Sequence, residues 1–235
     1  MPRPAEALRR RALVKRRIAL EAHRAATHCI IPGCGRLTMK AAREGLAPHH
    51  CRKHVEHRAR HGSYWLKTYT AAELKPYLTA ANAYIRLLAA TDKFIAAAIA
   101  DLRTTLDEAG PVEIATRLKG MSATKRAKIA LARLRVAQVE PERILCIVLA
   151  VTAVAESNGH RPREFRTVQF AKAVHRLASG TGWASSKKRA YPKSTGQVLR
   201  IMGRLLEKPC EFVLERHLPG VLAYRQRFGR QPKLS

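Results

Sequence analysis

The sequence is poor in acidic and in aromatic residues. Its 235 residues include 17 Asp and Glu against 45 Lys and Arg, which gives a formal net charge of +28. Such an excess of positive charge favours a polyanionic partner, nucleic acid first, because neutralised phosphates release condensed counterions. Aromatic residues make up only 6% of the chain, which argues against sheet-based readers of single strands. The scarcity of aromatic residues and the many alanines favour closely packed helices.

The sequence also lacks a long hydrophobic run. The most apolar stretch, residues 144–155, lies between Arg143 and Glu156, and it is too short to span a membrane, so it predicts a buried helix. Residues 1–20 are basic and lack the apolar segment of a secretory signal, although a mitochondrial presequence is an alternative. An odd number of cysteines, five, favours a reducing compartment over a disulfide framework. We therefore expect a cytoplasmic, nucleoid-associated protein with no membrane partner.

Charge divides the chain into blocks. Residues 1–70 have a net charge of +12, residues 71–118 of −1, and residues 119–235 of +17. A neutral segment between two basic ones is typical of a part that packs against protein, whereas the basic parts meet phosphates. We expect a basic helix or disordered arm at 1–27, a zinc-binding module at 28–70, a helical hairpin at 71–118 serving as spacer or homodimer contact, and a basic nucleic-acid-binding domain at 119–235.

Apolar periodicity and capping residues predict helices through the rest of the chain. The pattern from Leu74 to Leu106 fits a helical hairpin, or one long helix that bends near Thr91. Ser122 can cap a helix that runs through Val139, and Pro141 can open the next helix. Further helices are expected at 163–178, 195–207 and 209–217. The predicted fold is mainly α: a small zinc module, a helical hairpin, and a C-terminal helical domain of helix-turn-helix or winged-helix type.

Three cysteines and a histidine have the spacing of a structural zinc site. Cys29 and Cys34 bracket Ile-Ile-Pro-Gly, and Cys51 and His54 lie three residues apart, so a helix would place both on one face. Three thiolates and one imidazole close a tetrahedral site and leave no open position for catalysis. His50 or His57 remains an alternative to His54. Cys146 lies in the apolar run and is expected to be a core residue, and Cys210 is uninformative.

The same segment resembles a small zinc-binding module found near the N-termini of phage and mobile-element proteins, including some HNH-type nucleases. The resembling residues are Cys29, Pro32-Gly33-Cys34, Arg36, Gly45-Leu46, Cys51, His54, Arg58 and His61-Gly62. The chain departs from the pattern by extra residues at 47–50, and no HNH core follows. The resemblance implies an accessory module associated with nucleic acid and carries no nuclease activity with it.

Basic residues in three places are the candidate nucleic-acid contacts. In the loop 180–196, Trp183 and Tyr191 accompany a cluster of cations, an arrangement suited to a phosphate backbone or an unstacked base. The following helix would present Gln197, Arg200 and Arg204 on one face as a recognition helix. The full set is Arg10, Arg11, Arg16, Arg17, Arg52, Lys53, Arg58, Lys187, Lys188, Arg189, Lys193, Gln197, Arg200 and Arg204.

These features favour a zinc-stabilised protein that binds double-stranded DNA and is not an enzyme. It would act as an architectural, regulatory or recombination accessory factor of phage or mobile-element type. Three alternatives stay open: an RNA-binding component of a ribonucleoprotein, a nuclease or recombinase whose active site is not recognisable, and a subunit of a larger nucleoprotein assembly. His175 and Tyr191 are present, for example, but the remaining arginine and histidine frame of a tyrosine recombinase is not recognisable.

Overall fold

The structure is a computed structural model that describes residues 12–13, 16, 28–38, 48–113, 118, 120–159, 161–178 and 194–228. The chain divides into two compact units, Met1–Ala59 and Arg60–Ser235. The helix or arm predicted at 1–27 lies almost entirely outside the described residues, and so does most of the basic loop at 180–196.

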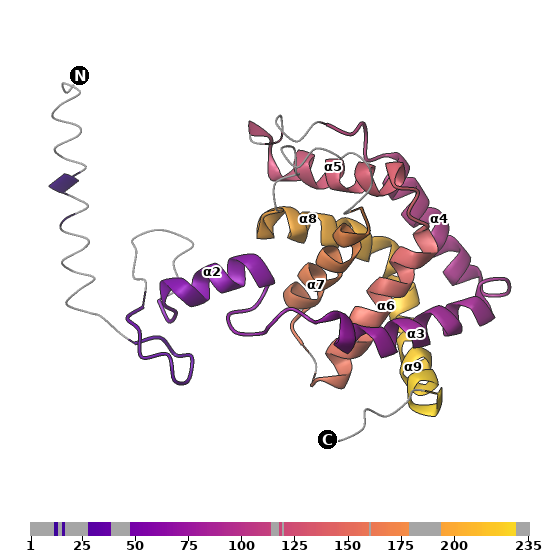
Figure 1. Ribbon diagram of the computed structural model, residues 1–235, viewed down its shortest axis with the longest axis horizontal. Helices are drawn as coiled ribbons and strands as arrows, with labels where there is room; N and C mark the ends of the chain where they lie inside the picture. Colours follow the sequence, from indigo (N-terminus) through magenta and orange to yellow (C-terminus); the bar gives the residue numbers. More distant parts are fainter. Residues whose placement is uncertain are drawn as a thin grey trace. The chain divides into compact units, whose positions relative to one another are not determined.

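The described part of the chain is mainly helical (Figure 1). The helices are α2 (Arg52–His61), α3 (Ala71–Leu88), α4 (Lys93–Asp107), α5 (Ala123–Val136), α6 (Pro141–Ser157), α7 (Arg163–His175), α8 (Gly196–Glu207) and α9 (Glu211–Phe228). Short 3₁₀ turns follow α7 at Arg176–Ala178 and precede α9 at Lys208–Cys210. The described residues form no strand, only an isolated bridge between His28 and Leu37. The predicted fold class is confirmed, and none of the described helices is long and apolar enough to cross a bilayer.

Local signals account for where the helices begin. Thr70 and Glu73 form a capping box at the start of α3, in which each side chain bonds the backbone N–H of the other. The Asp92 carboxylate accepts hydrogen bonds from the first N–H groups of α4, and the Ser122 hydroxyl does the same for α5. Pro141 occupies the first turn of α6, where a missing N–H costs nothing. The predicted starts at Ser122 and Pro141 are thus confirmed.

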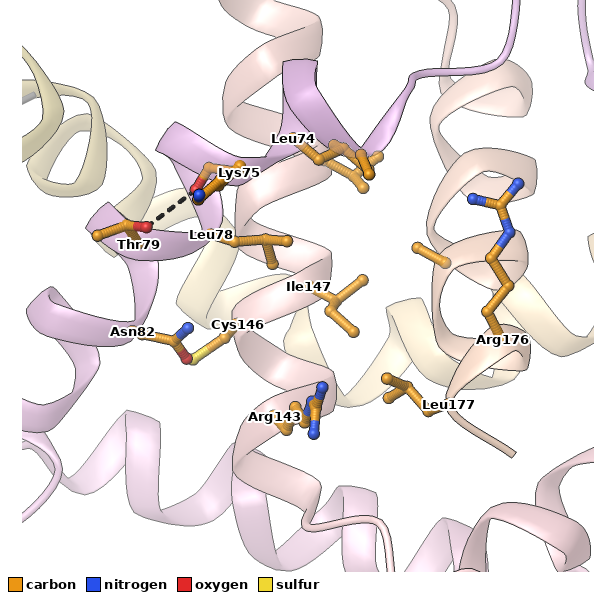
Figure 2. Close-up of a pocket in the computed structure, with 13 residues that line it drawn as sticks. Leu74, Lys75, Leu78, Thr79, Asn82, Arg143, Cys146, Ile147, Arg176 and Leu177 are labelled. Atoms are coloured by element: carbon orange, nitrogen blue, oxygen red, sulfur yellow. Dashed lines mark hydrogen bonds between the residues drawn. The ribbon is translucent and has the colours of Figure 1, made fainter. Parts of the chain in front are cut away.

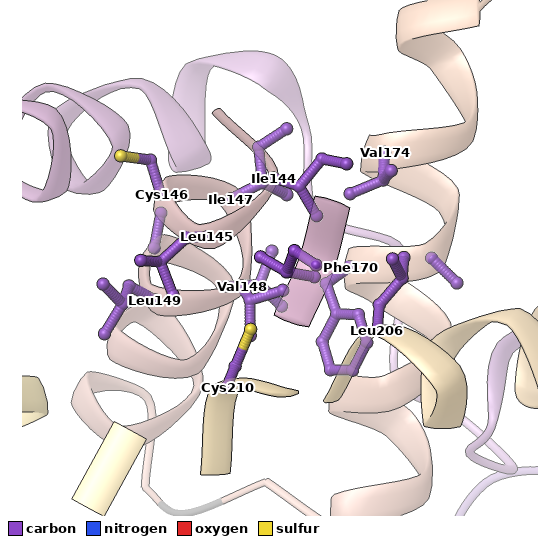
Figure 3. Close-up of a cluster of buried hydrophobic side chains, with 14 of the residues drawn as sticks. Ile144, Leu145, Cys146, Ile147, Val148, Leu149, Phe170, Val174, Leu206 and Cys210 are labelled. Carbon is purple, nitrogen blue, oxygen red and sulfur yellow. The ribbon is translucent and has the colours of Figure 1, made fainter. Parts of the chain in front are cut away.

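The central element of the helical unit is α6. Its side chains from Ile144 to Ala155 are all buried, and α3, α4, α7 and α9 pack against it. Figure 3 shows Ile144 and Val148 of α6 in one cluster with Phe170 of α7 and Leu206 of α8. Cys146 and Cys210 belong to the same core, and burial raises the pKa of each thiol to about 12. Neither thiol is therefore a reactive group.

The two consecutive helices predicted within 71–118 are present as α3 and α4, but they pack mainly on other helices. Although α3 and α4 are consecutive, α3 packs on α6 and α9, whereas α4 packs on α5 and α6. Their buried side chains, such as Ile85 and Leu102, join the same core as those of α6. The apolar face of each helix is thus covered within the unit, because a third helix fills the space that a hairpin partner would occupy. The buried side chains of α3 and α4 thus share one core with the later helices, and the role of the segment as spacer or homodimer contact stays a prediction.

The last helix is longer than predicted. The sequence indicated a helix ending at residue 217, but α9 continues through Pro219 to Phe228. Packing explains the continuation: Val221 is buried, and the Arg225 guanidinium stacks 3.9 Å from the ring centroid of Tyr77 on α3. Gly220 lies so close to the Tyr84 hydroxyl that a Cβ atom would collide with it. Tertiary contacts on both sides of the proline therefore hold the helix together.

Candidate metal centre

A short reversal of the chain positions the first two thiols. Cys29 N–H donates to the Arg36 carbonyl at 2.8 Å, and Cys34 N–H donates to the Ile31 carbonyl at 3.1 Å. Gly33 and Gly35 flank Cys34 with φ of +72° and +58°, a left-handed conformation that side chains oppose. The two glycines therefore permit the tight turn that brings the Cys34 sulfur back toward Cys29.

The start of α2 supplies the other two ligand atoms. Cys51 is the residue before the helix, and its carbonyl accepts the N–H of His54 at 3.0 Å, which begins the first turn. This turn places the Cys51 sulfur 3.4 Å from His54 Nδ1. A second contact joins the two chain segments, since the Ile30 N–H donates to the His49 carbonyl at 3.0 Å.

The four ligand atoms form one compact cluster. They all lie within 4.8 Å of one another; Cys29 and Cys51 are buried, and Cys34 and His54 are partly exposed. Cys34 Sγ lies 3.6 Å from Cys51 Sγ, and Cys29 Sγ lies 3.2 Å from His54 Nδ1. Tetrahedral zinc with bonds of ~2.3 Å to sulfur and ~2.0 Å to nitrogen separates its ligand atoms by roughly 3.5–3.8 Å. The cluster therefore has the dimensions of a metal site, and it contains His54 rather than His50 or His57.

The thiols do not share one electrostatic environment. Burial raises the pKa of Cys29, but hydrogen bonds from the backbones of Ile31 and Cys51 and from the side chains of His54 and Cys34 together outweigh burial and lower the pKa to about 6. A hydrogen bond from the backbone of Arg36 lowers the pKa of Cys34, but burial and the neighbouring thiols of Cys51 and Cys29 together raise it by more. The pKa of Cys34 therefore lies above its ordinary value. Repulsion between adjacent thiolates is the cost that a divalent cation removes when it binds them.

Comparison with known proteins gave no match: no family model fits the chain, and no curated protein or solved structure is significantly similar to it. The resemblance of residues 28–62 to phage and mobile-element modules consequently stays a prediction.

The predicted nucleic-acid contacts are only partly within the described residues. Those outside are Arg10, Arg11, Arg17, Lys187, Lys188, Arg189 and Lys193. In the first unit, Lys53 and Arg58 are exposed, and Arg52 forms an exposed ion pair with Glu56 at 2.9 Å.

On α8, Gln197 and Arg204 are exposed, whereas Val198, Leu199, Met202 and Leu206 are buried. Arg204 borders a cavity of about 540 Å³ together with Lys128 and Lys208. The chain between α7 with its 3₁₀ turn and α8 covers residues 179–195. That connection is much longer than the 3–4 residues of a tight helix-turn-helix, and the helix-turn-helix or winged-helix assignment stays a prediction.

Several arginines serve the fold. The Arg135 guanidinium donates to the carbonyls of Leu106, Asp107 and Gly110, and it thereby caps the end of α4. Arg163 bonds Glu207 at 3.1 Å, a carboxylate only 7% exposed, and Arg166 bonds Glu156 at 3.1 Å. These arginines are held by partners and are not available as free phosphate contacts.

The structure also brings together a polar cluster that the sequence did not reveal. Lys172 of α7 lies 2.7 Å from His61 Nδ1 and 3.0 Å from Thr68 Oγ1. No spacing rule links these residues, because Lys172 stands more than a hundred positions after the other two. Their cluster is taken up below.

Proposed function

We propose that this protein binds double-stranded DNA through its basic surface and that a structural zinc ion holds its N-terminal module in shape. Zinc is the metal that best suits three thiolates and one imidazole at these separations, since soft sulfur ligands and tetrahedral geometry select it over magnesium or calcium. The ion would tie the turn around Cys34 to the start of α2. With four protein ligands, its role would be structural.

The imbalance of charge carries the proposal. The chain has 45 basic and 17 acidic residues, and 14 of the 17 lie in the described part. Many of these carboxylates are already engaged: Glu156, Glu164, Glu207 and Glu211 pair with arginines, and Asp92 caps a helix. The chain has far more basic than acidic residues, and this excess suits a phosphate backbone, which would make affinity salt-dependent and largely independent of sequence.

We propose that the protein acts as an accessory factor in phage or mobile-element DNA transactions. The N-terminal module, with Lys53 and Arg58, would contact one stretch of duplex. The exposed face of α8, with Gln197 and Arg204, would contact another, and any reading of bases would be confined to such side chains.

Competition binding tests the proposal. A labelled 20-base-pair duplex is bound to the protein, and its displacement by unlabelled duplex DNA, structured RNA or single strands is followed by fluorescence anisotropy. Unlabelled duplex DNA is expected to compete best. A clear preference for RNA would instead support a ribonucleoprotein component. Supercoiled plasmid incubated with the protein and a divalent metal should stay intact, and nicking would show that the protein is a nuclease.

A further inference from the structure

Three polar groups of the helical unit converge on one point. Lys172 Nζ lies 2.7 Å from His61 Nδ1 and 3.0 Å from Thr68 Oγ1, and the His61 and Thr68 atoms lie 2.9 Å apart. An ammonium group only donates, so His61 Nδ1 accepts and its ring proton resides on Nε2. The Thr68 hydroxyl accepts from Lys172 and keeps a proton to donate. Lys172 also retains one N–H beyond these two bonds.

The backbone holds this arrangement in place. Gln169, one turn earlier on α7, donates from Nε2 to the His61 carbonyl at 3.2 Å. Gly62 has a φ of +77°, and a Cβ atom there would lie 2.6 Å from the Glu164 carbonyl oxygen. The chain from His61 onward is therefore docked closely on α7, and the cluster is a built feature of the fold.

The part of the chain that the structure describes places no counter-charge at this cluster. Among the described residues, neither Lys172 nor Arg176 forms an ion pair. The nearby carboxylates are engaged by other groups: Glu164 by Arg200, and Glu207 by Arg163 and Thr167. The charges that act on Lys172 are those of Arg176 and Arg200, and burial together with these two cations lowers the pKa of Lys172 to about 8. A half-buried cation among cations is costly unless an anion completes the site.

Arg176 adds a guanidinium to this side of α7. It borders a cavity of about 420 Å³ whose floor is formed by apolar residues such as Ile147 and Leu177. In Figure 2 the Arg176 side chain runs from the end of α7 along the helix, and its guanidinium points away from Leu177 and Arg143. Since Lys172 lies one turn earlier on the same helix, the two cationic groups share a face.

We propose that His61, Thr68, Lys172 and Arg176 form a binding site for a phosphate oxyanion, with Arg200 beside it. The site offers an ammonium N–H, a hydroxyl proton and a guanidinium without an ion pair among the described residues, which together match the several acceptors of a tetrahedral phosphate. Because Arg200 belongs to α8, the site lies next to the helix that is proposed to face DNA. The proposal rests on the proposed function for the source of the phosphate, a nucleic-acid backbone.

Pyridoxal phosphate is a direct probe of such a site, since its phosphate directs it to cationic sites and its aldehyde condenses with an amine. Borohydride then reduces the imine to a stable adduct that peptide mass spectrometry locates. Lys172 is expected to be labelled at least fivefold faster than exposed lysines such as Lys128. Inorganic pyrophosphate or duplex DNA should each protect it, and pyridoxal without phosphate should show no preference for it.

Amino-acid substitutions provide a second, independent test of the site. Lys172→Gln, Arg176→Gln and Thr68→Val should each weaken pyrophosphate binding at least fivefold in calorimetry, whereas Lys172→Arg should retain most of it. Lys128→Gln makes the same charge change on α5 and should leave binding unaltered. Circular dichroism identifies any variant that fails to fold, and the labelling of wild-type protein does not depend on the variants.

The outcomes separate the two proposals. Protection by pyrophosphate without any binding of duplex DNA would keep the anion site and refute the DNA-binding function. Duplex binding without protection of Lys172 would keep the function and overturn the site. Labelling of Lys172 at the average rate, with pyrophosphate binding unchanged in Lys172→Gln, would also overturn it.

Discussion

Arg200 Nε donates to Glu164 Oε1 at 2.7 Å, and this pair fastens α8 to α7. The arginine that the sequence placed on a recognition face thus also has a partner within the fold. Its side chain is 21% exposed, so the guanidinium is held in a defined position at the edge of the surface proposed to meet DNA. A positioned arginine loses less conformational entropy on binding phosphate than a mobile one.

Neutralising Glu164 tests this relationship. Glu164→Gln removes a negative charge beside Arg200, so we expect the variant to bind DNA at least as tightly as the wild type does. The free energy of unfolding should fall by about 1 kcal/mol, as is usual for a partly exposed ion pair. Arg200→Gln should lose the same stability and bind DNA several-fold more weakly. Equal DNA affinity in both variants would show that Arg200 serves only the fold.

The metal ligands are tested by their effect on bound zinc. Purified wild-type protein should contain about one zinc per chain, measured by mass spectrometry of the metal, and Cys34→Ser or Cys51→Ser should lose it. Cys146→Ala removes a cysteine of the helical core and should retain the zinc. Because the described residues of the first unit bury few other side chains, proteolysis of the two serine variants should be confined to residues 28–59. Stoichiometric zinc in both serine variants would refute the ligand set.

Gly62 is expected to resist substitution more than Gly159. Both residues have positive φ, +77° and +83°, so alanine is strained at either position. Only at Gly62 does the new Cβ meet backbone, at 2.6 Å from the Glu164 carbonyl oxygen, whereas nothing lies within 4 Å at Gly159. Gly62→Ala should therefore lower the free energy of unfolding by about 1–3 kcal/mol more than Gly159→Ala in urea denaturation. Equal losses would mean that the close contact on α7 is absent.

Lys172→Met should stabilise the DNA-free protein at neutral pH. Burial lowers the pKa of Lys172 to about 8 from an ordinary value of 10.5, so the folded chain disfavours the charged amine. Below about pH 8 both folded and unfolded chains carry the charge, and the wild type bears the full cost. Between about pH 8 and 10.5 only the unfolded chain remains protonated, so wild-type stability rises with pH.

The advantage of the methionine variant should accordingly shrink across that range in thermal melts taken at several pH values. In the variant, where Lys172 no longer occupies the Nδ1 lone pair, the Thr68 hydroxyl can donate to His61 Nδ1, since these two atoms lie 2.9 Å apart. A methionine variant that is less stable than wild type at pH 7 would contradict the assignment of Lys172 as an uncompensated cation.

Much of the fold could be predicted because its signals are local. The apolar run from Ile144 to Ala155 predicts a buried helix whatever surrounds it. Ser122 accepts a hydrogen bond from the first turn of its own helix, and Pro141 stands where its helix needs no N–H. The four ligands of the metal centre are similarly recognisable, because their spacing follows from one tight turn and one helical turn. His54 could be distinguished from His50 and His57 only once the backbone placed its ring nitrogen against the thiols.

The rest depends on contacts between distant residues. The apolar faces of α3 and α4 look the same in sequence whether they pack against each other or against α6. The sequence alone therefore cannot distinguish these two packing arrangements. A proline normally ends a helix, and only the contacts of Val221 and Arg225 show why α9 continues past Pro219. The pairing of Lys172 with His61 joins residues 111 positions apart, and no periodicity in the sequence encodes it.

The salt dependence of duplex binding tests the central claim most directly. Affinity for a labelled 20-base-pair duplex is measured by fluorescence anisotropy from 50 to 200 mM salt. If the chain neutralises several phosphates with its basic residues, affinity should fall by about a thousandfold over this range, and log K should decline linearly with log salt. A duplex affinity that does not change with salt, or no binding at 50 mM, would contradict the account.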